Sequence, residues 1–304
     1  MSSLVEATAP SRLELLGGTP GGQAGPAASG PLRLAIALDR RVWCGVERTP
    51  GGVEIHSKDT LQRVVAPDLA GIPETAGPVG RAARALAAAR VLSGVRIVTQ
   101  ERVPGDAGLG TGAALSLALA AALEPGLDGI EVIRRAAAVE AQLGGEAAES
   151  DLHAAAFGGA HVLLASHGAT SVARLPIDPA RIEECLLLVD PGKVEFLAPS
   201  LLGPPAAGAD LVAALRAGRY ADVGTCLAAV HRDRFESAPG AVREVVERVA
   251  QAGGAAWPCG RLLAVWAAPG ARSDGPREVL LAALKQAGVR SFPARVDVRG
   301  LEVE

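Results

Sequence analysis

The sequence predicts an α+β protein built from two lobes. Short β-branched or alternating runs, which are typical of strands, are mixed with Ala-rich runs that are typical of helices, and hairpin turn signals separate some of the strands. The break between the lobes is expected between roughly residues 167 and 205, where a polar patch and a buried strand precede the Pro/Gly-rich GPPAAGAD at 203–210. We therefore expect an N-terminal lobe at residues 1–180 and a C-terminal lobe at residues 181–304.

The first half opens with three predicted strands. The second and third, RVWCGVE and GVEIHS, are separated by RTPG, a turn signal, and are expected to pair as a hairpin. The stretch 17–30 is rich in proline and glycine and is expected to be a long flexible loop. The predicted elements are strands 32–38, 41–47 and 52–57, helix 79–92, strand 94–103, helices 111–123 and 130–143, a short helix at Asp151, and strand 160–166.

The second half repeats the mixture without an internal sequence repeat. CLLLVD is a continuous apolar run and is expected to be a buried strand. The predicted elements are strand 185–190, helices near 209–216, 219–233 and 240–252, strand 261–268, helix 277–288 and strand 292–298.

Composition indicates a soluble globular protein. Of the 304 residues, 49% are hydrophobic and 21% are charged, and the formal charge of −3 gives no electrostatic argument for nucleic acid or an anionic membrane. The start of the chain lacks the pattern of a signal peptide, and the Ala-rich run 111–123 is too short to span a bilayer. Widely spaced cysteines without a CxxC pair indicate free thiols, so we expect a cytoplasmic protein. The cysteines are Cys44, Cys185, Cys226 and Cys259.

A glycine-rich loop, VPGDAGLGTGAA, stands between a predicted strand and helix 111–123. This order directs several free backbone N–H groups at one point, which favours an anion and above all a phosphate. Thr111 is expected at the N-cap, where its hydroxyl caps the helix or meets a metal ion. The loop matches neither GxxxxGK[ST] nor GxGxxG, and an ordinary capped helix after a turn accounts for the same pattern.

Two acidic residues follow the loop. Glu140 lies on the apolar side of helix 130–143, where a carboxylate is costly unless it is paired or binds a cation, although a position near the helix end also explains it. Asp151 lies near the start of a short helix, where it or Ser150 can serve as a cap. His153 and His161 do not have zinc-motif spacing and are expected to be structural or surface residues.

In their order along the chain, these stretches resemble the GHMP kinase superfamily. VPGDAGLGTGAA is similar to the family's P-x3-G-L-G-S-S-A phosphate loop. APSRLELLGGTP, LGGEAAESDLHAAAFGG and LKQAGVRSFPARVDVRGLEV resemble the opening, middle and C-terminal tail of its sugar kinases that act on D-glycero-D-manno-heptose 7-phosphate and of related fucokinase-like enzymes. The resemblance covers nearly the whole chain. It implies the two-lobed GHMP kinase fold, with an N-terminal lobe like domain 2 of ribosomal protein S5 and a ferredoxin-like C-terminal lobe.

The resemblance also implies the roles of individual residues, with ATP and Mg as cofactors. Asp151 matches the catalytic aspartate, and Arg12 matches a basic residue near that aspartate and the transferring phosphate. Glu140 matches the acidic Mg ligand, and Thr111 replaces a serine that approaches the same ion. The residues implied in binding the nucleotide phosphates are Pro104, Gly108, Leu109, Gly110, Thr111, Gly112 and Ala113.

The sequence departs from the family pattern at several places. Gly112 replaces the second serine of the loop, and Pro20 or Gly21 stands where the sugar kinases have the aspartate of GGGTD. The lysine of GGKQDQ is replaced within GEAAES. The family's C-terminal GAGGGG-like run corresponds to AAWPCGRLLAV, in which only Gly260 survives.

The function expected from this resemblance is phosphorylation of a sugar or sugar-phosphate hydroxyl by Mg·ATP, with a heptose 7-phosphate as the best specific substrate. We expect a small-molecule substrate, no nucleic acid or membrane partner, and a monomer or homodimer. A family member that binds a nucleotide or sugar phosphate without transferring phosphate is an alternative. Another is a synthase like β-ribofuranosylaminobenzene 5'-phosphate synthase, whose GLGSG-type loop is similar to GLGTG.

Overall fold

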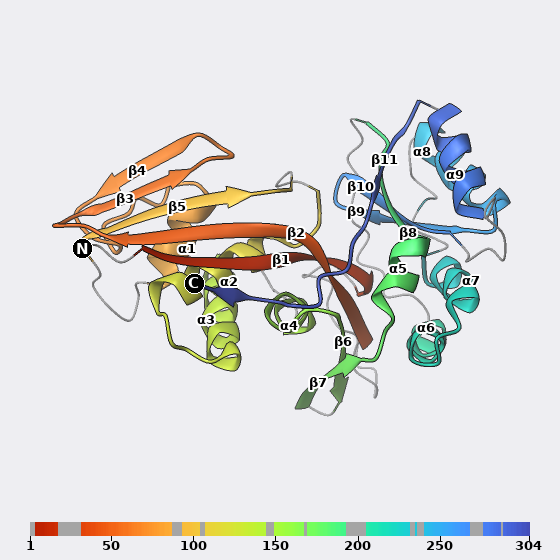
Figure 1. The fold of residues 1–304 in the computed structure, drawn as a ribbon, viewed down its shortest axis with the longest axis horizontal. Coiled ribbons are helices and arrows are strands. Elements are labelled where there is room, and N and C mark those ends of the chain that lie inside the picture. Colours follow the sequence, from red (N-terminus) through yellow and green to blue (C-terminus); the bar gives the residue numbers. More distant parts are fainter. Residues whose placement is uncertain are drawn as a thin grey trace.

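A computed structural model describes most of the chain and confirms a mixed α and β architecture in two parts (Figure 1). The described residues are 4–17, 32–86, 93–103, 107–143, 149–166, 169–192, 205–231, 235, 240–267, 276–286 and 288–304. The loop expected at 17–30 therefore lies outside them except for Gly17, as do Pro20, Gly21 and Pro104.

The first part is an eight-stranded sheet covered by helices on one face. Its main path has the order β12-β1-β2-β5-β3-β4, and β6 with β7 extends from β2. The strands are β1 (Leu4–Leu16), β2 (Leu32–Arg48), β3 (Val53–Ser57), β4 (Gln62–Ala66), β5 (Val95–Glu101), β6 (Ala160–Ser166), β7 (Ala169–Leu175) and β12 (Glu302–Val303). The helices are α1 (Pro78–Leu86), α2 (Thr111–Leu123), α3 (Gly129–Gln142) and α4 (Glu149–Phe157).

The prediction that strands 41–47 and 52–57 pair as a hairpin is wrong. β5 lies between them, antiparallel to β2 and parallel to β3. The turn residues bond to the start of β5 instead of closing a hairpin, because Thr49 N–H donates to the Gly94 carbonyl and Gly94 N–H donates to the Gly52 carbonyl. β3 pairs on its other side with β4, a strand that the sequence did not predict. The predicted strands 32–38 and 41–47 are parts of one continuous strand, β2.

The helix α2 passes through the middle of the first part. Its run TGAALSLALAAAL is apolar on all sides, as expected for a helix that is buried all round. It packs against β1, β2 and α3. The main core of this part therefore lies between the sheet and the helices, and it places the start of α2 where the sheet, α3 and α4 converge.

The second part contains a four-stranded sheet in the order β11-β8-β10-β9. Its strands are β8 (Leu186–Asp190), β9 (Ala255–Cys259), β10 (Leu262–Trp266) and β11 (Arg290–Pro293). The helices of this part are α5 (Pro179–Cys185), α6 (Pro205–Arg216), α7 (Tyr220–His231), α8 (Gly240–Gln251) and α9 (Pro276–Gln286).

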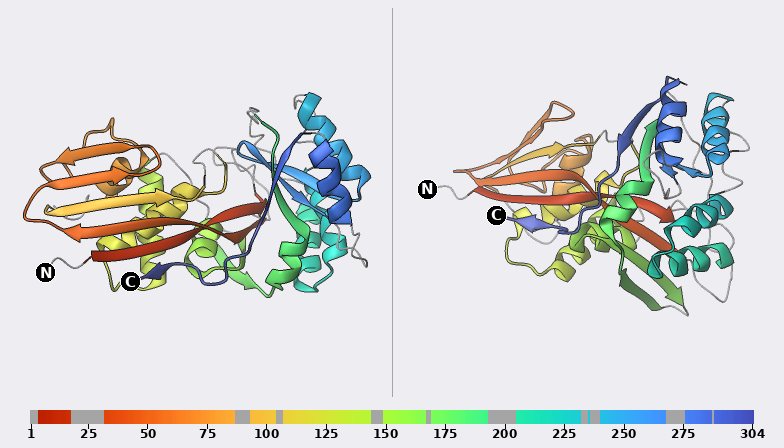
Figure 2. Two further views of the ribbon diagram at one scale, coloured as in Figure 1. Left: turned by 45° about the horizontal axis from the view of Figure 1, so that its top comes forward. Right: turned by 45° about the vertical axis from the view of Figure 1, so that its right-hand side comes forward.

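Both faces of the second sheet are buried. Side chains of β8 and β10 alternate between a core shared with α8 and α9 and a second core that also contains residues of β1, β2 and β6. Leu187 and Leu263 belong to the first of these cores, and Leu188 and Leu262 belong to the second. A continuous apolar core thus joins the two parts, and the turned views in Figure 2 show β1 and β2 reaching from the first part to the second.

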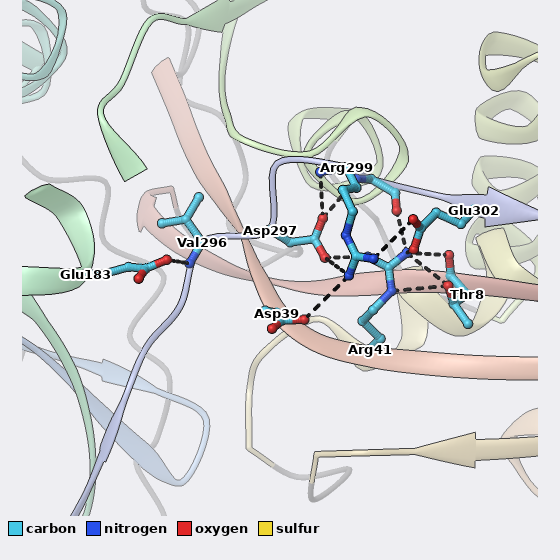
Figure 3. Close-up of polar contacts among 9 residues, drawn as sticks. Thr8, Asp39, Arg41, Glu183, Val296, Asp297, Arg299 and Glu302 are labelled. Carbon is cyan, nitrogen blue, oxygen red and sulfur yellow. Dashed lines mark hydrogen bonds and ion pairs between the residues drawn. The ribbon is translucent and has the colours of Figure 1, made fainter. Parts of the chain in front are cut away.

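The chain end returns to the first sheet, where β12 pairs with β1. Arg41 holds this segment: its guanidinium pairs with Asp297 and donates to the Gly300 carbonyl and to Thr8 (Figure 3). The segment also contacts the end of α4, since Leu301 N–H donates to the Ala156 carbonyl. The boundary at 180/181 remains our proposal, and the last strand of the chain crosses back over it.

Candidate active site

The glycine-rich loop leads directly into α2, but Thr111 is not the N-cap as expected. Gly110 occupies the N-cap with φ 64°, in the left-handed region that favours glycine, and no side chain caps the helix. The N–H groups of Thr111, Gly112 and Ala113 have no acceptor among the described residues, while the Ala114 N–H bonds to the Gly110 carbonyl. Three backbone donors therefore remain at the positive end of a helix, an arrangement suited to phosphate oxygens.

Arg12 and Asp151 form a buried ion pair beside this helix end. Arg12 Nη2 lies 2.5 Å from Asp151 Oδ2. A Cβ on Gly110 would lie 2.8 Å from the Arg12 Cγ and Nε atoms, so the arginine passes directly against the N-cap residue. Arg12 is on β1 and its N–H donates to the Leu109 carbonyl at 2.8 Å, which fixes the strand against the loop.

The electrostatics of this pair favour a proton acceptor. Burial raises the pKa of Asp151, and Arg12 and Arg33 oppose that shift. Burial acts to lower the pKa of Arg12, but Asp151 and Glu14 outweigh it, so the guanidinium stays charged. Asp151 Oδ1 is buried and has no hydrogen-bond partner among the described residues. One carboxylate oxygen is thus held by arginine, and the other is available to a ligand.

Glu140 reaches α2 from the neighbouring helix α3. The Ser116 hydroxyl donates to Glu140 Oε1 at 2.6 Å. A Cβ on Gly112 would lie 3.8 Å from each carboxylate oxygen, so the carboxylate faces the first turn of α2. This contact explains the acidic residue on the apolar side of α3, because the carboxylate is half-buried against a hydroxyl and a helix N-terminus.

The loop also contacts the second part of the molecule. Gly260, in the turn between β9 and β10, packs its backbone against Gly108 so closely that a Cβ on either residue would overlap the other. The Cys259 thiol donates to the Gly108 carbonyl at 3.1 Å, and burial raises the pKa of this thiol to about 12. Only one glycine remains from the family's C-terminal glycine run, but the turn that contains it still packs against the glycine-rich loop.

A cavity of about 610 Å³ opens at the start of α2. Thr111 and Gly112 form part of its wall, together with the turn that follows β3 and the end of β5. Two carboxylate side chains, those of Asp59 and Glu101, line the cavity. The Glu101 N–H donates to Asp59 Oδ2 at 2.6 Å. Burial, followed by the charge of Asp59, raises the pKa of the Glu101 carboxyl. The helix end therefore faces a space large enough for a small molecule.

The expected site residues that the structure describes meet around the start of α2, except that the Leu109 and Ala113 side chains are buried in the core and offer only backbone groups. Reasoning from the sequence missed Glu14, Arg33 and Ser116. Ser116 is a polar residue within an apolar helix, a signal that was available. Glu14 shares a face of β1 with Arg12, but that strand was not predicted.

A family model described as the GHMP kinases N terminal domain matches residues 78–159. The chain contains a GHMP kinase N-terminal domain. This domain spans the loop, Glu140 and Asp151, but not Arg12. A search of curated proteins finds no match.

Solved structures show that the GHMP kinase fold extends over the rest of the chain. A D-glycero-D-manno-heptose 1-phosphate kinase from Bacteriodes thetaiotaomicron has a TM-score of 0.76 at 18% identity, covering 99% of this chain and 98% of that one. Lactococcus lactis galactokinase complexed with galactose has a TM-score of 0.71 at 12% identity, covering 99% and 95%. Homoserine kinase from Cytophaga hutchinsonii has a TM-score of 0.66 at 16% identity, covering 99% and 97%. At these identities the likeness shows the fold, which agrees with the two-lobed GHMP fold expected from the sequence.

Within the described parts of the chain, no helix is long and apolar enough to cross a membrane. The same parts contain no group of three or more His, Cys, Asp or Glu side chains placed to hold a metal ion. The four cysteines are free thiols.

Proposed function

We propose that this protein is a Mg·ATP-dependent kinase that phosphorylates a hydroxyl of a sugar or sugar phosphate, with a heptose 7-phosphate-like acceptor as the best specific substrate. The observation that carries the proposal is the Arg12–Asp151 pair against Gly110, at a helix end with three open N–H groups. We infer that it acts in the cytoplasm on small molecules, as a monomer or homodimer.

In this proposal, the loop holds the nucleotide phosphates. The N–H groups of Thr111, Gly112 and Ala113 donate to phosphate oxygens, and the 610 Å³ cavity beside them accommodates the nucleoside. Gly108 and Gly110 are needed as glycines, because both have positive φ and both are in close contact with other groups. Pro104 completes the expected loop and lies outside the described residues.

Asp151 then orients the acceptor hydroxyl and takes its proton through the oxygen that arginine leaves open. A raised carboxyl pKa strengthens the base at neutral pH, and Arg12 stabilises negative charge on the phosphoryl group in transfer. Because the two side chains are in direct contact, the carboxylate of Asp151 and the guanidinium of Arg12 are held in a fixed position relative to each other.

The residues at the start of α2 fit a magnesium ion. Mg²⁺ usually takes one or two protein carboxylates together with water and substrate phosphates, and Glu140 supplies a carboxylate that faces Gly112. The Thr111 hydroxyl is the second expected ligand. A magnesium ion held there would supply positive charge that offsets the negative charge developing on the phosphoryl group. Ser116 orients Glu140 through its hydrogen bond.

The test is Asp151→Asn, assayed with Mg·ATP and a panel of aldoses and aldose phosphates. We expect ADP formation to fall by about 10²–10⁴-fold, while Mg·ATP binding measured by calorimetry persists. The unpaired Arg12 charge will also lower stability, so the assay is run below the unfolding midpoint of the variant.

Wild-type protein decides between the proposal and its alternatives. Nucleotide binding without turnover of any acceptor would favour a member that binds but does not transfer phosphate. Product formation from phosphoribosyl diphosphate and an aminobenzoate would select the synthase. Absence of Mg·ATP binding would rule out the kinase.

A further inference from the structure

The end of the chain connects the two parts of the molecule along a path that passes the candidate active site. After β11 in the second sheet, residues 294–301 run back to the first sheet, where β12 pairs with β1 (Figure 1). We call this segment the C-terminal strap. It is tied to the second part through Glu183 of α5, whose Oε1 accepts the Val296 N–H at 2.9 Å.

A ring of backbone hydrogen bonds joins the strap to the elements that carry the candidate catalytic pair. The Asp297 N–H donates to the Ala37 carbonyl at 3.0 Å, the Ala37 N–H donates to the Gly159 carbonyl at 2.8 Å, and the Gly159 N–H donates to the Asp297 carbonyl at 2.7 Å. Ala37 is the β2 residue opposite Arg12 on β1. Gly159 follows the end of α4, the helix that carries Asp151. The ring therefore fixes the strand of Arg12 relative to the helix of Asp151.

The strap also packs directly on the last turn of α4. The Leu301 N–H donates to the Ala156 carbonyl at 2.9 Å. A Cβ on Gly158 would lie 2.5 Å from the Val298 carbonyl carbon, and a Cβ on Gly300 would lie 2.3 Å from the Ala156 oxygen. These contacts join backbone to backbone in a closely packed region, so a displacement of the strap is transmitted to the helix.

The buried carboxylate of Asp297 gives the strap its shape. Its side chain is 1% exposed, and Oδ1 accepts the N–H groups of Arg299 and Gly300, both at 2.9 Å. Oδ2 pairs with the guanidinium of Arg41 on β2 (Figure 3). A buried carboxylate is stable only with such partners. The turn that contacts α4 therefore depends on the Asp297 side chain.

We propose that Asp297 is a positioning residue for the Arg12–Asp151 pair, an inference that rests on the proposed kinase function. The pair is made by two separate elements, β1 and α4, and proton acceptance and charge stabilisation require a fixed geometry between its members. Asp297 holds the strap against Ala37, opposite Arg12, and against the last turn of α4. No described residue of the strap lines the 610 Å³ cavity at the start of α2, so Asp297 acts on the catalytic step and not on nucleotide binding.

The kinetic test uses Asp297→Asn, which keeps an oxygen for the two backbone N–H groups but loses the charge that pairs with Arg41. We expect kcat per folded molecule to fall at least about tenfold, while the KM for ATP changes by less than about twofold. Leu284→Ala is the control, because it destabilises a core whose described members include no strap residue. Its kcat per folded molecule should remain at the wild-type value. Equal losses of kcat in the two variants would overturn the inference.

A second pair of variants disturbs the same contact through the backbone. Gly300→Ala places a Cβ against the Ala156 carbonyl at a φ of 79°. Gly288→Ala carries the same kind of backbone strain, with a φ of 69°, but its Cβ would meet no atom of the described residues within 4 Å. We expect kcat per folded molecule to fall at least about fivefold in Gly300→Ala and to stay unchanged in Gly288→Ala. An unchanged kcat in Gly300→Ala would contradict the positioning role.

A spectroscopic readout separates this inference from the kinase proposal. NMR of aspartate carboxyl carbons in isotope-labelled protein reports Asp151 as the signal that Asp151→Asn removes. Arg12 opposes the rise in the pKa of Asp151 that burial causes, so a displaced guanidinium raises the titration midpoint. We expect a rise of at least about half a pH unit in Asp297→Asn and none in Leu284→Ala.

This rise would support the positioning role even if wild type turns over no acceptor and the kinase proposal fails. A midpoint that is the same in wild type and Asp297→Asn, or that moves equally in Asp297→Asn and Leu284→Ala, refutes the inference.

Discussion

The backbones of Gly108 and Gly260 are in direct contact across the two parts of the molecule. A Cβ on Gly108 would lie 2.1 Å from the Gly260 nitrogen, and a Cβ on Gly260 would lie 2.4 Å from the Gly108 nitrogen. Both residues have positive φ, 71° and 53°. The glycine that remains from the expected C-terminal run is therefore the one that touches the phosphate loop.

Gly260→Ala should damage both stability and the candidate active site. Gly253→Ala is the control, because Gly253 also has positive φ (75°) but a Cβ there meets nothing within 4 Å. The control should lose about 1–2 kcal/mol of unfolding free energy from backbone strain. Gly260→Ala should lose more, because the loop must also move, and kcat should fall at least about tenfold. Urea unfolding and ADP release measure the two effects, and equal losses in both variants would contradict the contact.

Glu140→Gln should weaken magnesium binding without unfolding the protein. The amide keeps an acceptor for Ser116 but loses the charge, so we expect the Mg concentration for half-maximal ATP binding to rise at least about tenfold. Glu131→Gln on the same helix is the control, since Glu131 pairs with arginines at the protein surface. A magnesium titration that is the same for both variants and wild type would remove Glu140 from the site.

Arg41→Met should strongly destabilise the protein because it leaves Asp297 charged and buried. Breaking a buried pair by removing one partner costs about 3–5 kcal/mol. Arg299→Gln is the control: this side chain is 56% exposed and lies 3.9 Å from Asp297, so it should change stability by less than about 1 kcal/mol. The urea unfolding midpoints of the two variants measure this difference in stability. A similarly small loss of stability in both variants would mean that Arg41 does not anchor the chain end.

His161 should make stability depend on pH. Burial, followed by His153 and Arg174, lowers its pKa from 6.5 to about 4. Between these values the unfolded chain binds a proton that the folded protein does not, so stability falls as pH falls, by about 1.4 kcal/mol per pH unit.

The measurement is the unfolding free energy of wild type and His161→Gln at about pH 7 and about pH 5. The loss between the two pH values should be smaller in the variant by about 2 kcal/mol. Parallel losses would show that the folded protein binds this proton as readily as the unfolded chain.

Local patterns predicted much of the secondary structure. Helix 111–123 and strand 94–103 follow from Ala/Leu content and alternation, and both are observed close to their expected bounds. Strand pairing was harder to predict from the sequence. β5 pairs with both β2 and β3 beside the RTPG turn, and no local signal in that turn indicates this pairing. β1 was missed because its alternation is interrupted by Ala-Pro-Ser and its partner β2 begins 16 residues later.

The residues of the candidate site were likewise predicted only in part from the sequence. The glycine loop, Glu140 and Asp151 are visible as local departures from the surrounding pattern, and their order carried the family resemblance. Arg33 could not be identified in this way, because nothing near it in the sequence indicates that its charge acts on Asp151. Thr111 was expected at the N-cap, but the left-handed conformation of Gly110 moves the cap back by one residue.

The sequence by itself determined the helices and strands with strong periodicity, the anion-binding loop and the family of folds, because these depend on neighbouring residues and on motif order. Only the tertiary structure decided that Arg12 pairs with Asp151 and that Gly260 supports Gly108. Each of these contacts joins residues far apart in the chain, and they meet because a continuous apolar core fixes the two sheets against each other.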